Sequence, residues 1–218
     1  MLPLSIIQKT KTEVLDCIFP KKCVGCRSLN VWFCFDCFSK IIHQPPIRRK
    51  VGDFSVYACT NYKDKIIQNL VNHLKYSGVT DLATDGAKLL TILYSAIVTD
   101  EADFITWIPL HPKRQAARTF NQAELLASSL ARELQIDYSE LLIRQRYSES
   151  QTHLSDEMRK NNVADIFQIN ETNNQKIVGR TILLVDDVVT SGATISEAAR
   201  VLRQAGAYKV IGLCLASR

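Results

Sequence analysis

The chain of 218 residues lacks any apolar run that approaches the ~18 residues of a membrane-spanning helix. Its opening segment, MLPLSIIQKTKTEVLD, contains neither a long apolar stretch nor a small-residue cleavage site. Internal repeats and low-complexity tracts are also missing, while 46% hydrophobic and 22% charged residues are typical of a folded domain. We therefore expect no export and no membrane insertion, and we predict the cytoplasm as the location.

Acidic residues are scarce at the N-terminal end. Residues 1–60 hold nine Lys or Arg against four Asp or Glu, and the rest of the chain is balanced, so the first quarter carries the whole net charge of +5. Such an end attracts nucleic acid, although a solvated basic surface has the same composition. The candidates for DNA contact are Lys40, Arg48, Arg49 and Lys50, and for the last three a solvated linker is the open alternative.

Four of the seven cysteines form two C-x-x-C pairs in CVGCRSLNVWFCFDC, namely Cys23 with Cys26 and Cys34 with Cys37. Two turns of this kind complete a tetrahedral shell of four thiolates, which leaves no open position and predicts a structural zinc site. Four free buried thiols and redox pairs are the alternatives. We expect the neighbouring aromatic residues to form a miniature core around the metal: Trp32, Phe33, Phe35 and Phe38.

The stretch HQPPIRRKVGD, residues 43–53, has the composition of a linker. It predicts a division into an N-terminal helix and four-cysteine, zinc-ribbon-like module over residues 1–50 and a second domain over residues 51–218.

Beyond the linker, strand-like and helix-like patterns alternate. We expect strands at 54–62, 104–111, 181–187 and 208–216, and helices at 64–77, 81–98, 121–134 and 193–205. The polar region 144–162 predicts a long mobile loop. Strands that alternate with helices indicate an α/β fold with a mostly parallel sheet and helices on both faces.

The strongest chemical signal is ILLVDDVVTSGATISEAARVL. An apolar strand leads to Asp186 and Asp187, and the loop of Thr190, Ser191, Gly192, Ala193 and Thr194 then opens a helix. Unpaired N–H groups and the helix dipole favour a phosphate there, and carboxylates accept hydrogen bonds from ribose hydroxyls or recruit magnesium. An ordinary helix cap explains one Ser and one Asp only. A G-x-x-x-x-G-K motif is missing, which excludes a Walker-type nucleotide site.

VDDVVTSGAT resembles the ribose-5-phosphate-binding signature of type I phosphoribosyltransferases. With the upstream cysteine pairs, the chain from about residue 17 to residue 218 resembles the ComF family of competence proteins. Four further stretches match that family's pattern: LKYSG (74–78), IPLH (108–111), RTFNQAELLA (118–127) and QTHL (151–154). Thr119 stands where the family has glycine, and Ser191 replaces a common threonine.

The resemblance implies a role in natural transformation, with single-stranded DNA handled in the cytoplasm and a helicase-like partner. It also implies that Asp186 and Asp187 face the ribose hydroxyls of phosphoribosyl pyrophosphate, with magnesium, and that residues 190–194 hold its 5-phosphate. The loop with Pro109, His111, Lys113 and Arg114 would lie where relatives contact pyrophosphate, unless it is only a solvated loop. Arg118, Asn121 and Gln122 match the family motif without a role that chemistry assigns.

Three functions remain open. The first is a DNA-handling competence factor that uses a phosphoribosyltransferase fold for phosphate recognition. The second is an active phosphoribosyltransferase on an unidentified acceptor, for which we find no segment that would cover a base. The third is an adaptor whose partner affinity is controlled by phosphoribosyl pyrophosphate.

Overall fold

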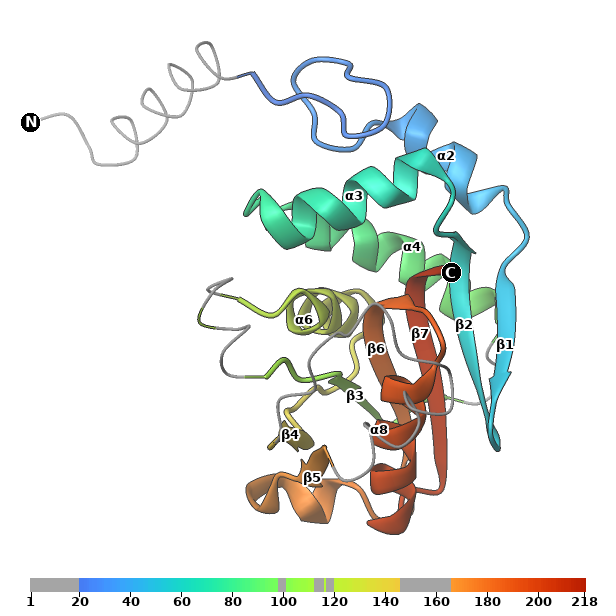
Figure 1. The fold of residues 1–218 in the computed structure, drawn as a ribbon, viewed down its shortest axis with the longest axis vertical. Helices are drawn as coiled ribbons and strands as arrows, with labels where there is room; N and C mark the ends of the chain where they lie inside the picture. Colours follow the sequence, from blue (N-terminus) through green and yellow to red (C-terminus); the bar gives the residue numbers. More distant parts are fainter. Residues whose placement is uncertain (1–19, 98–100, 112–115, 117–119, 146–165) are drawn as a thin grey trace, which may run out of the picture.

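The computed structural model describes residues 20–97, 101–111, 116, 120–145 and 166–218. Its main feature is a five-stranded sheet in the order β1-β2-β7-β6-β3 (Figure 1). β2, β7, β6 and β3 are parallel, and β1 is antiparallel to β2 at the edge. Their bounds are β1 Ile47–Val51, β2 Phe54–Asn61, β3 Phe104–Trp107, β6 Thr181–Val189 and β7 Lys209–Ser217.

Helices cover both faces of the sheet, as predicted. One face carries α3 (Lys65–Tyr76), α4 (Leu82–Ile97) and α6 (Gln122–Leu134), and the other carries α8 (Ala193–Gln204). Successive side chains of β6 point to opposite faces of the sheet, so alternate residues pack in two different cores. Leu183 and Val185 pack with α3, α4 and α6, whereas Ile182 and Leu184 pack with α8. The α8 side also holds three short elements, β4 (Leu142–Arg144), β5 (Phe167–Ile169) and the 3₁₀ helix η1 (Glu171–Lys176).

Local sequence explains where the helices begin. The Asp64 carboxylate caps α3 by accepting hydrogen bonds from the N–H groups of Ile66 and Ile67, and the Asn121 amide oxygen caps α6 in the same way. α8 differs, because its N-cap is Gly192, which has no side chain to cap the first turn. The first N–H groups of α8 are the feature that matters for function.

Two predictions about element bounds are wrong. The stretch 43–53 is not a linker, because it contains β1, which pairs with β2 residue by residue from Ile47 with Ala58 to Val51 with Phe54. Three basic residues in a row look solvated in sequence, but an edge strand exposes every second side chain. The strand around the two acids also continues past Asp187 to Val189.

The cysteine module packs directly on the sheet domain. The helix α2 (Phe35–Ile42) begins directly after Cys34. Cys37 and Ile41 of α2 belong to the same core cluster as Leu70 of α3. The Asn69 amide on α3 donates a hydrogen bond to the Val24 carbonyl oxygen over 2.9 Å. The division at residues 50 and 51 stays a prediction, but these contacts leave the module without a core of its own.

The predicted aromatic core of the module is only partly correct. Phe33 is buried, and Phe38 packs edge-on against it with ring centroids 6.1 Å apart. Phe35 is 80% exposed, because it occupies the outer face of α2.

Several predictions fall outside the described residues: nearly all of the loop at 144–162, the QTHL stretch, and Lys113, Arg114, Arg118 and Thr119. In the described part of the chain, no helix combines the length and the apolar character needed to cross a membrane.

Candidate functional site

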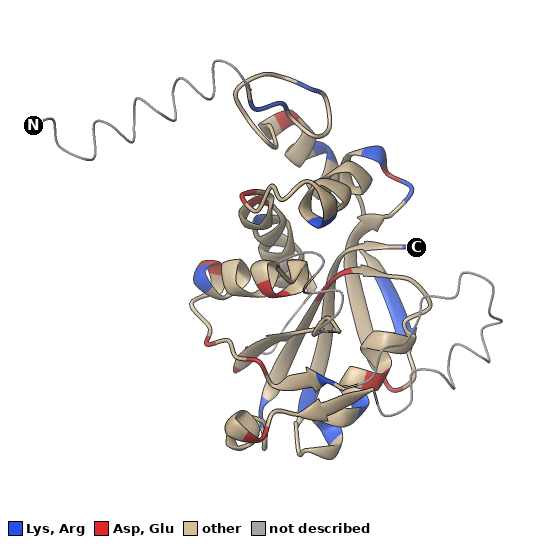
Figure 2. Ribbon diagram, turned by 60° about the vertical axis from the view of Figure 1, so that its left-hand side comes forward, with Lys and Arg blue, Asp and Glu red and all other residues tan. Residues whose placement is uncertain are grey.

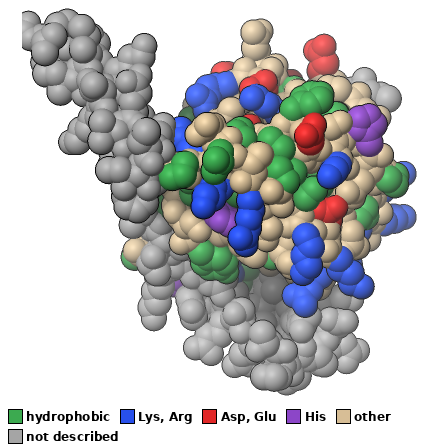
Figure 3. Space-filling view, turned by 90° about the horizontal axis from the view of Figure 1, so that it is seen from above, with side chains coloured by type: hydrophobic (Ala, Val, Ile, Leu, Met, Phe, Trp, Pro, Cys, Tyr) green, Lys and Arg blue, Asp and Glu red, His purple; other side chains and the backbone are tan. Residues whose placement is uncertain are grey.

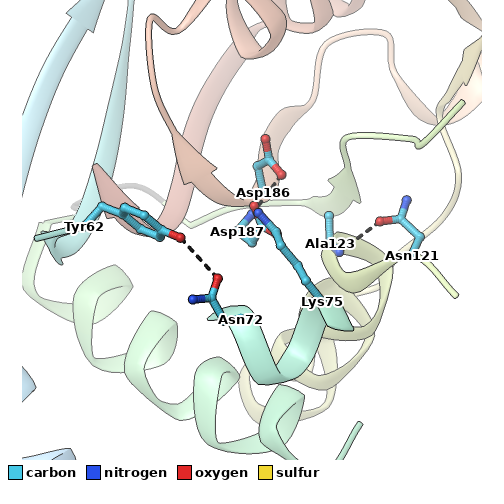
Figure 4. Close-up of polar contacts among 7 residues, drawn as sticks. All are labelled: Tyr62, Asn72, Lys75, Asn121, Ala123, Asp186 and Asp187. Carbon is cyan, nitrogen blue, oxygen red and sulfur yellow. Dashed lines mark hydrogen bonds and ion pairs between the residues drawn. The ribbon is translucent and has the colours of Figure 1, made fainter. Parts of the chain in front are cut away.

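Asp186 and Asp187 lie next to each other near the carboxyl end of β6, with their side chains on opposite faces of the sheet. The Asp186 carboxylate accepts a hydrogen bond from the Asp187 N–H over 2.8 Å. Asp187 is buried, and its Oδ2 lies 2.9 Å from the Nζ of Lys75 at the end of α3 (Figure 4). α3 therefore supplies a cation to the inner acid of the pair.

The environment of the two acids works against full ionisation of Asp186. Burial and the charge of Asp187 raise the pKa of Asp186 to about 7, against the smaller opposing effects of Lys75, the Asp187 N–H and Arg144. Asp186 is therefore partly protonated near neutral pH. A ligand that brings hydroxyl donors or a divalent cation would favour the ionised pair.

The loop Thr190–Thr194 joins β6 to α8, and its backbone follows a path that only glycine takes easily. Gly192 has φ +81°, and a Cβ atom there would lie 2.9 Å from both Cγ atoms of Val51. Thr190 and Ser191 are exposed, and the Ala193 N–H points at the Ser191 hydroxyl at 3.4 Å. Backbone N–H groups, hydroxyls and the helix dipole thus converge on one exposed end, which is a geometry that binds phosphate.

Arg49 holds this loop from β1. Its guanidinium donates hydrogen bonds to the Thr190 carbonyl oxygen, to the Arg218 carbonyl oxygen over 2.8 Å, and to the Ser217 hydroxyl over 3.4 Å. The Arg218 N–H in turn donates to the Val189 carbonyl oxygen. Arg49, which the charge pattern predicts as a DNA contact, therefore binds the loop Thr190–Thr194, called the phosphate loop below, and the C-terminal strand β7.

The second predicted loop is described only in part. Asn121 is buried, donates to the Ile108 carbonyl oxygen over 3.1 Å and accepts from the Ala123 N–H, so it joins the start of α6 to the residue that follows β3. Gln122 is buried beside it. His111 is described, whereas Lys113 and Arg114 are not.

The four cysteines form one cluster, with all four Sγ atoms within 4.8 Å of one another. Zn–S bonds of about 2.3 Å put the sulfurs of a tetrahedral site about 3.8 Å apart. The Sγ atoms of Cys26 and Cys34 are already 3.5 Å apart. A Cβ on Gly25 would lie 2.5 Å from the Cys37 Sγ, which explains the glycine in the first turn. The donor set and its spacing fit a zinc ion.

The thiols differ in acidity as the chain stands. The Ser28 hydroxyl and N–H, with help from Cys34, lower the pKa of Cys26 to about 6. Burial and the neighbouring sulfurs raise the pKa of Cys37. A bound cation lowers the pKa of every thiol that it touches, so four thiolates are compatible with an ion at their centre.

Sequence reasoning missed the roles of Lys75 and Arg49. The signal for Lys75 was the stretch LKYSG, which matches a family pattern but shows its use only when α3 is placed against β6. The signal for Arg49 was a basic run, which does not say that this side chain faces the loop while Arg48 and Lys50 face away.

The fold and this site define the class of protein. Residues 121–218 match the family model described as "Phosphoribosyl transferase domain", and the predicted type I phosphoribosyltransferase fold is confirmed.

The chain is also a homologue of competence and DNA utilization proteins, as its resemblance to the ComF family predicts. It is 34% identical over 151 residues to the DNA utilization protein YhgH of Escherichia coli K12, covering 67% of this chain and 65% of the relative. Competence protein F of Haemophilus influenzae is 34% identical over 104 residues, 47% and 45% of the two chains. Competence protein ComFC of Bacillus subtilis is 28% identical over 152 residues, 70% and 58%. The match thus spans a little less than two thirds of YhgH.

Proposed function

We propose that this chain is a competence protein of the ComF type, which handles incoming single-stranded DNA in the cytoplasm together with a helicase-like partner. The support comes from relatives named for competence and DNA utilization, and from the four-cysteine cluster joined to a phosphoribosyltransferase domain. In this proposal the domain recognises a phosphorylated ribose, and the cysteine module supports it.

The ligand that we propose for the domain is phosphoribosyl pyrophosphate with magnesium. One observation carries this choice: two acids stand beside a helix N-terminus whose N-cap is a glycine. The loop Thr190–Thr194 would hold the 5-phosphate, and Asp186 and Asp187 would face the ribose hydroxyls. His111, Lys113 and Arg114 would lie on the pyrophosphate side, where positive charge suits that group.

Ligand-dependent thermal stability tests the choice of ligand. A ligand at about 100 times its Kd raises the free energy of unfolding by about 2.7 kcal/mol. We expect phosphoribosyl pyrophosphate with magnesium to raise the Tm, ribose 5-phosphate to raise it less, and pyrophosphate alone to raise it least. Equal shifts by all three compounds would indicate a general anion effect and would rule the proposal out.

Single-stranded DNA binding is tested by the fluorescence anisotropy of a labelled oligonucleotide. The proposal predicts binding that weakens with salt, at a slope of about −0.7 in log K against log salt for each phosphate contacted. Binding that is absent at low salt would contradict the DNA-handling role and leave the phosphoribosyl site as a separate question.

We propose zinc as the ion of the four-cysteine cluster, with a structural role. The four thiols leave no coordination position for a substrate, so the ion would fix the turns at Cys23–Cys26 and Cys34–Cys37 and supply no chemistry. Elemental analysis of the purified protein should find one zinc per chain. A metal content near zero in protein purified without chelators would contradict this assignment.

An active phosphoribosyltransferase is the second candidate, favoured by the family match of residues 121–218. The decisive assay is the release of pyrophosphate from phosphoribosyl pyrophosphate in the presence of bases or single-stranded DNA. Turnover that disappears in Asp186→Asn and Asp187→Asn variants would establish the enzyme. No release with any acceptor would leave ligand binding, including the adaptor alternative, as the use of the site.

A further inference from the structure

A pocket lies at the end of the sheet opposite to the phosphate loop. β2 and β7 begin to pair at Val56 and Gly212, so Phe54 and Ser55 of β2 and residues 209–211 of β7 extend beyond the paired region. The strands thus leave a notch between them, with a cavity of about 320 Å³. β7 has nine residues, which puts the notch about 26 Å from the strand's carboxyl end.

Three cations from three separate elements line this notch: Arg48 from β1, Arg203 from the last turn of α8, and Lys209 from the start of β7. The acid in the lining, Asp53, is 94% exposed and lies 4.0 Å from Arg203 at its nearest atom, so solvent screens it. Three basic side chains and one acidic side chain thus line the notch. In the printed sequence these cations are far apart, and only the sheet brings them together.

Aromatic rings lie among these cations. The Arg48 guanidinium sits 5.8 Å from the ring centroid of Tyr57, and its Nε donates to the Ser55 hydroxyl over 3.2 Å. The Arg203 guanidinium sits 5.6 Å from the ring centroid of Phe54. Tyr208 at the rim is 78% exposed. These contacts orient the two guanidinium groups, and Tyr208 offers an exposed ring beside them.

Basic side chains elsewhere are less concentrated. Figure 2 shows Lys and Arg along β1 at the sheet edge. Seen from the end that carries the cysteine module (Figure 3), Lys and Arg side chains are dispersed among hydrophobic and polar ones. Basic side chains, aromatic rings and a concave surface coincide at the notch.

We propose that this notch binds one nucleotide, with its phosphate between Arg48 and Lys209 and its base stacked against Tyr57 or Tyr208. A volume of about 320 Å³ is within the range of small-ligand sites, which begins at roughly 300 Å³. Aromatic rings beside cations are the combination that holds single-stranded nucleic acid. The nucleotide is either free or one unit of a strand, and the strand version rests on the DNA-handling function proposed above.

The test compares a labelled oligothymidylate, a free nucleoside monophosphate and an acidic peptide as probes of the full-length protein. Arg48→Glu and Lys209→Glu should each weaken nucleotide binding about tenfold or more. Lys50→Glu is the matched control, because Lys50 is exposed on the same face of β1 but does not line the notch. Tyr57→Leu should weaken binding, whereas Tyr57→Phe, which keeps the ring, should not.

Each outcome decides the proposal. Binding of the oligonucleotide that depends on Arg48 and the Tyr57 ring supports the strand version, and the same dependence for the monophosphate supports a free-nucleotide site. An equal loss in Lys50→Glu would mean diffuse attraction and would overturn the pocket. Preference for the acidic peptide, or no nucleotide binding, would also overturn it. Oligonucleotide binding that survives Arg48→Glu would leave the DNA-handling function standing and the pocket refuted.

Discussion

At the scale of single residues, the site depends on an unequal pair of acids. Asp187 is neutralised by Lys75, whereas Asp186 faces the other side of the sheet without an ion pair among the described contacts and carries a raised pKa. The sequence predicts both acids from the strand and loop around them. Their inequality depends on α3, which lies more than a hundred residues earlier in the chain, so no local pattern reports it.

The first prediction concerns the pH dependence of stability. The pKa of Asp186 is about 7 in the folded chain and 3.8 in the unfolded chain, so unfolding releases a proton between these values. Stability therefore falls as pH rises through this window. The Asp186→Asn variant lacks this loss, so its Tm relative to wild type should increase from pH 5 to pH 8 in a calorimetric scan.

Asp103→Asn is the control for that measurement. The Thr181 N–H and Arg180 lower the pKa of Asp103. The ionised Asp103 therefore stabilises the folded chain fully at any pH above the ordinary pKa of an aspartate, and this stabilisation is lost only at acid pH. Its Tm difference from wild type should stay constant from pH 5 to pH 8. The same slope in both variants would refute the special environment of Asp186.

The second prediction isolates the contact under the phosphate loop. Gly192→Ala forces a side chain into a left-handed backbone position and against Val51, whereas Gly78→Ala meets the same backbone penalty, about 1–2 kcal/mol, with nothing within 4 Å. Urea denaturation should find Gly192→Ala the more destabilised of the two. Equal losses would show that Val51 yields freely and that the loop is not tightly packed on β1.

At the scale of elements, two segments far from β6 in sequence shape the site. α3 joins the cysteine module to the two acids. Asn69 in α3 donates to the Val24 carbonyl oxygen of the module, and Lys75 near the C-terminal end of α3 pairs with Asp187. β1 joins the sheet edge to the phosphate loop through Arg49.

The third prediction tests the hold of β1 on the loop. Arg49→Lys keeps the charge but removes the guanidinium, whose Nη1 donates to both the Thr190 and the Arg218 carbonyl oxygens, and puts a flexible ammonium in its place. Amide hydrogen exchange of residues 190–192 should become faster in this variant. Arg48→Lys, on the opposite face of β1, should leave exchange in the loop unchanged, and an equal effect of both would assign the change to general loss of β1.

Elements with strong periodicity could be predicted from the sequence, and the others could not. β6, α8, β7, α3, α4 and α6 lie close to their predicted bounds because each buries a continuous apolar face. β1 could not be predicted because its sequence, IRRKV, has only two apolar residues, Ile47 and Val51. Its strand structure comes from pairing with β2. β4 and β5 have three residues each, too few for a period to show.

At the scale of the whole molecule, the cysteine cluster and the sheet domain share one core, since Cys23, Cys37, Ile41 and Leu70 belong to a single buried cluster. Two neighbouring basic residues of β1 also have different surroundings. Arg49 donates to the Thr190 carbonyl oxygen, whereas Arg48 lines the notch.

The fourth prediction follows from the shared core. Removal of the metal by a strong chelator should lower the Tm of the entire chain in one transition, because the turns that place Cys37 and Ile41 in the core lose their support. Cys26→Ser should abolish zinc binding and lower the Tm similarly. Cys59→Ala, which changes a buried cysteine outside the cluster, should keep one zinc per chain. A separate low-temperature transition for the module would contradict the shared core.

We propose that β6 and the loop Thr190–Thr194 form a site for a phosphorylated ribose. The decisive experiment is calorimetric titration of phosphoribosyl pyrophosphate with magnesium, on wild type and on the Asp186→Asn, Asp187→Asn double variant. We expect saturable binding of about one ligand per chain to the wild type, and its loss in a double variant that remains folded. No binding to the wild type, or equal binding to both proteins, would contradict it.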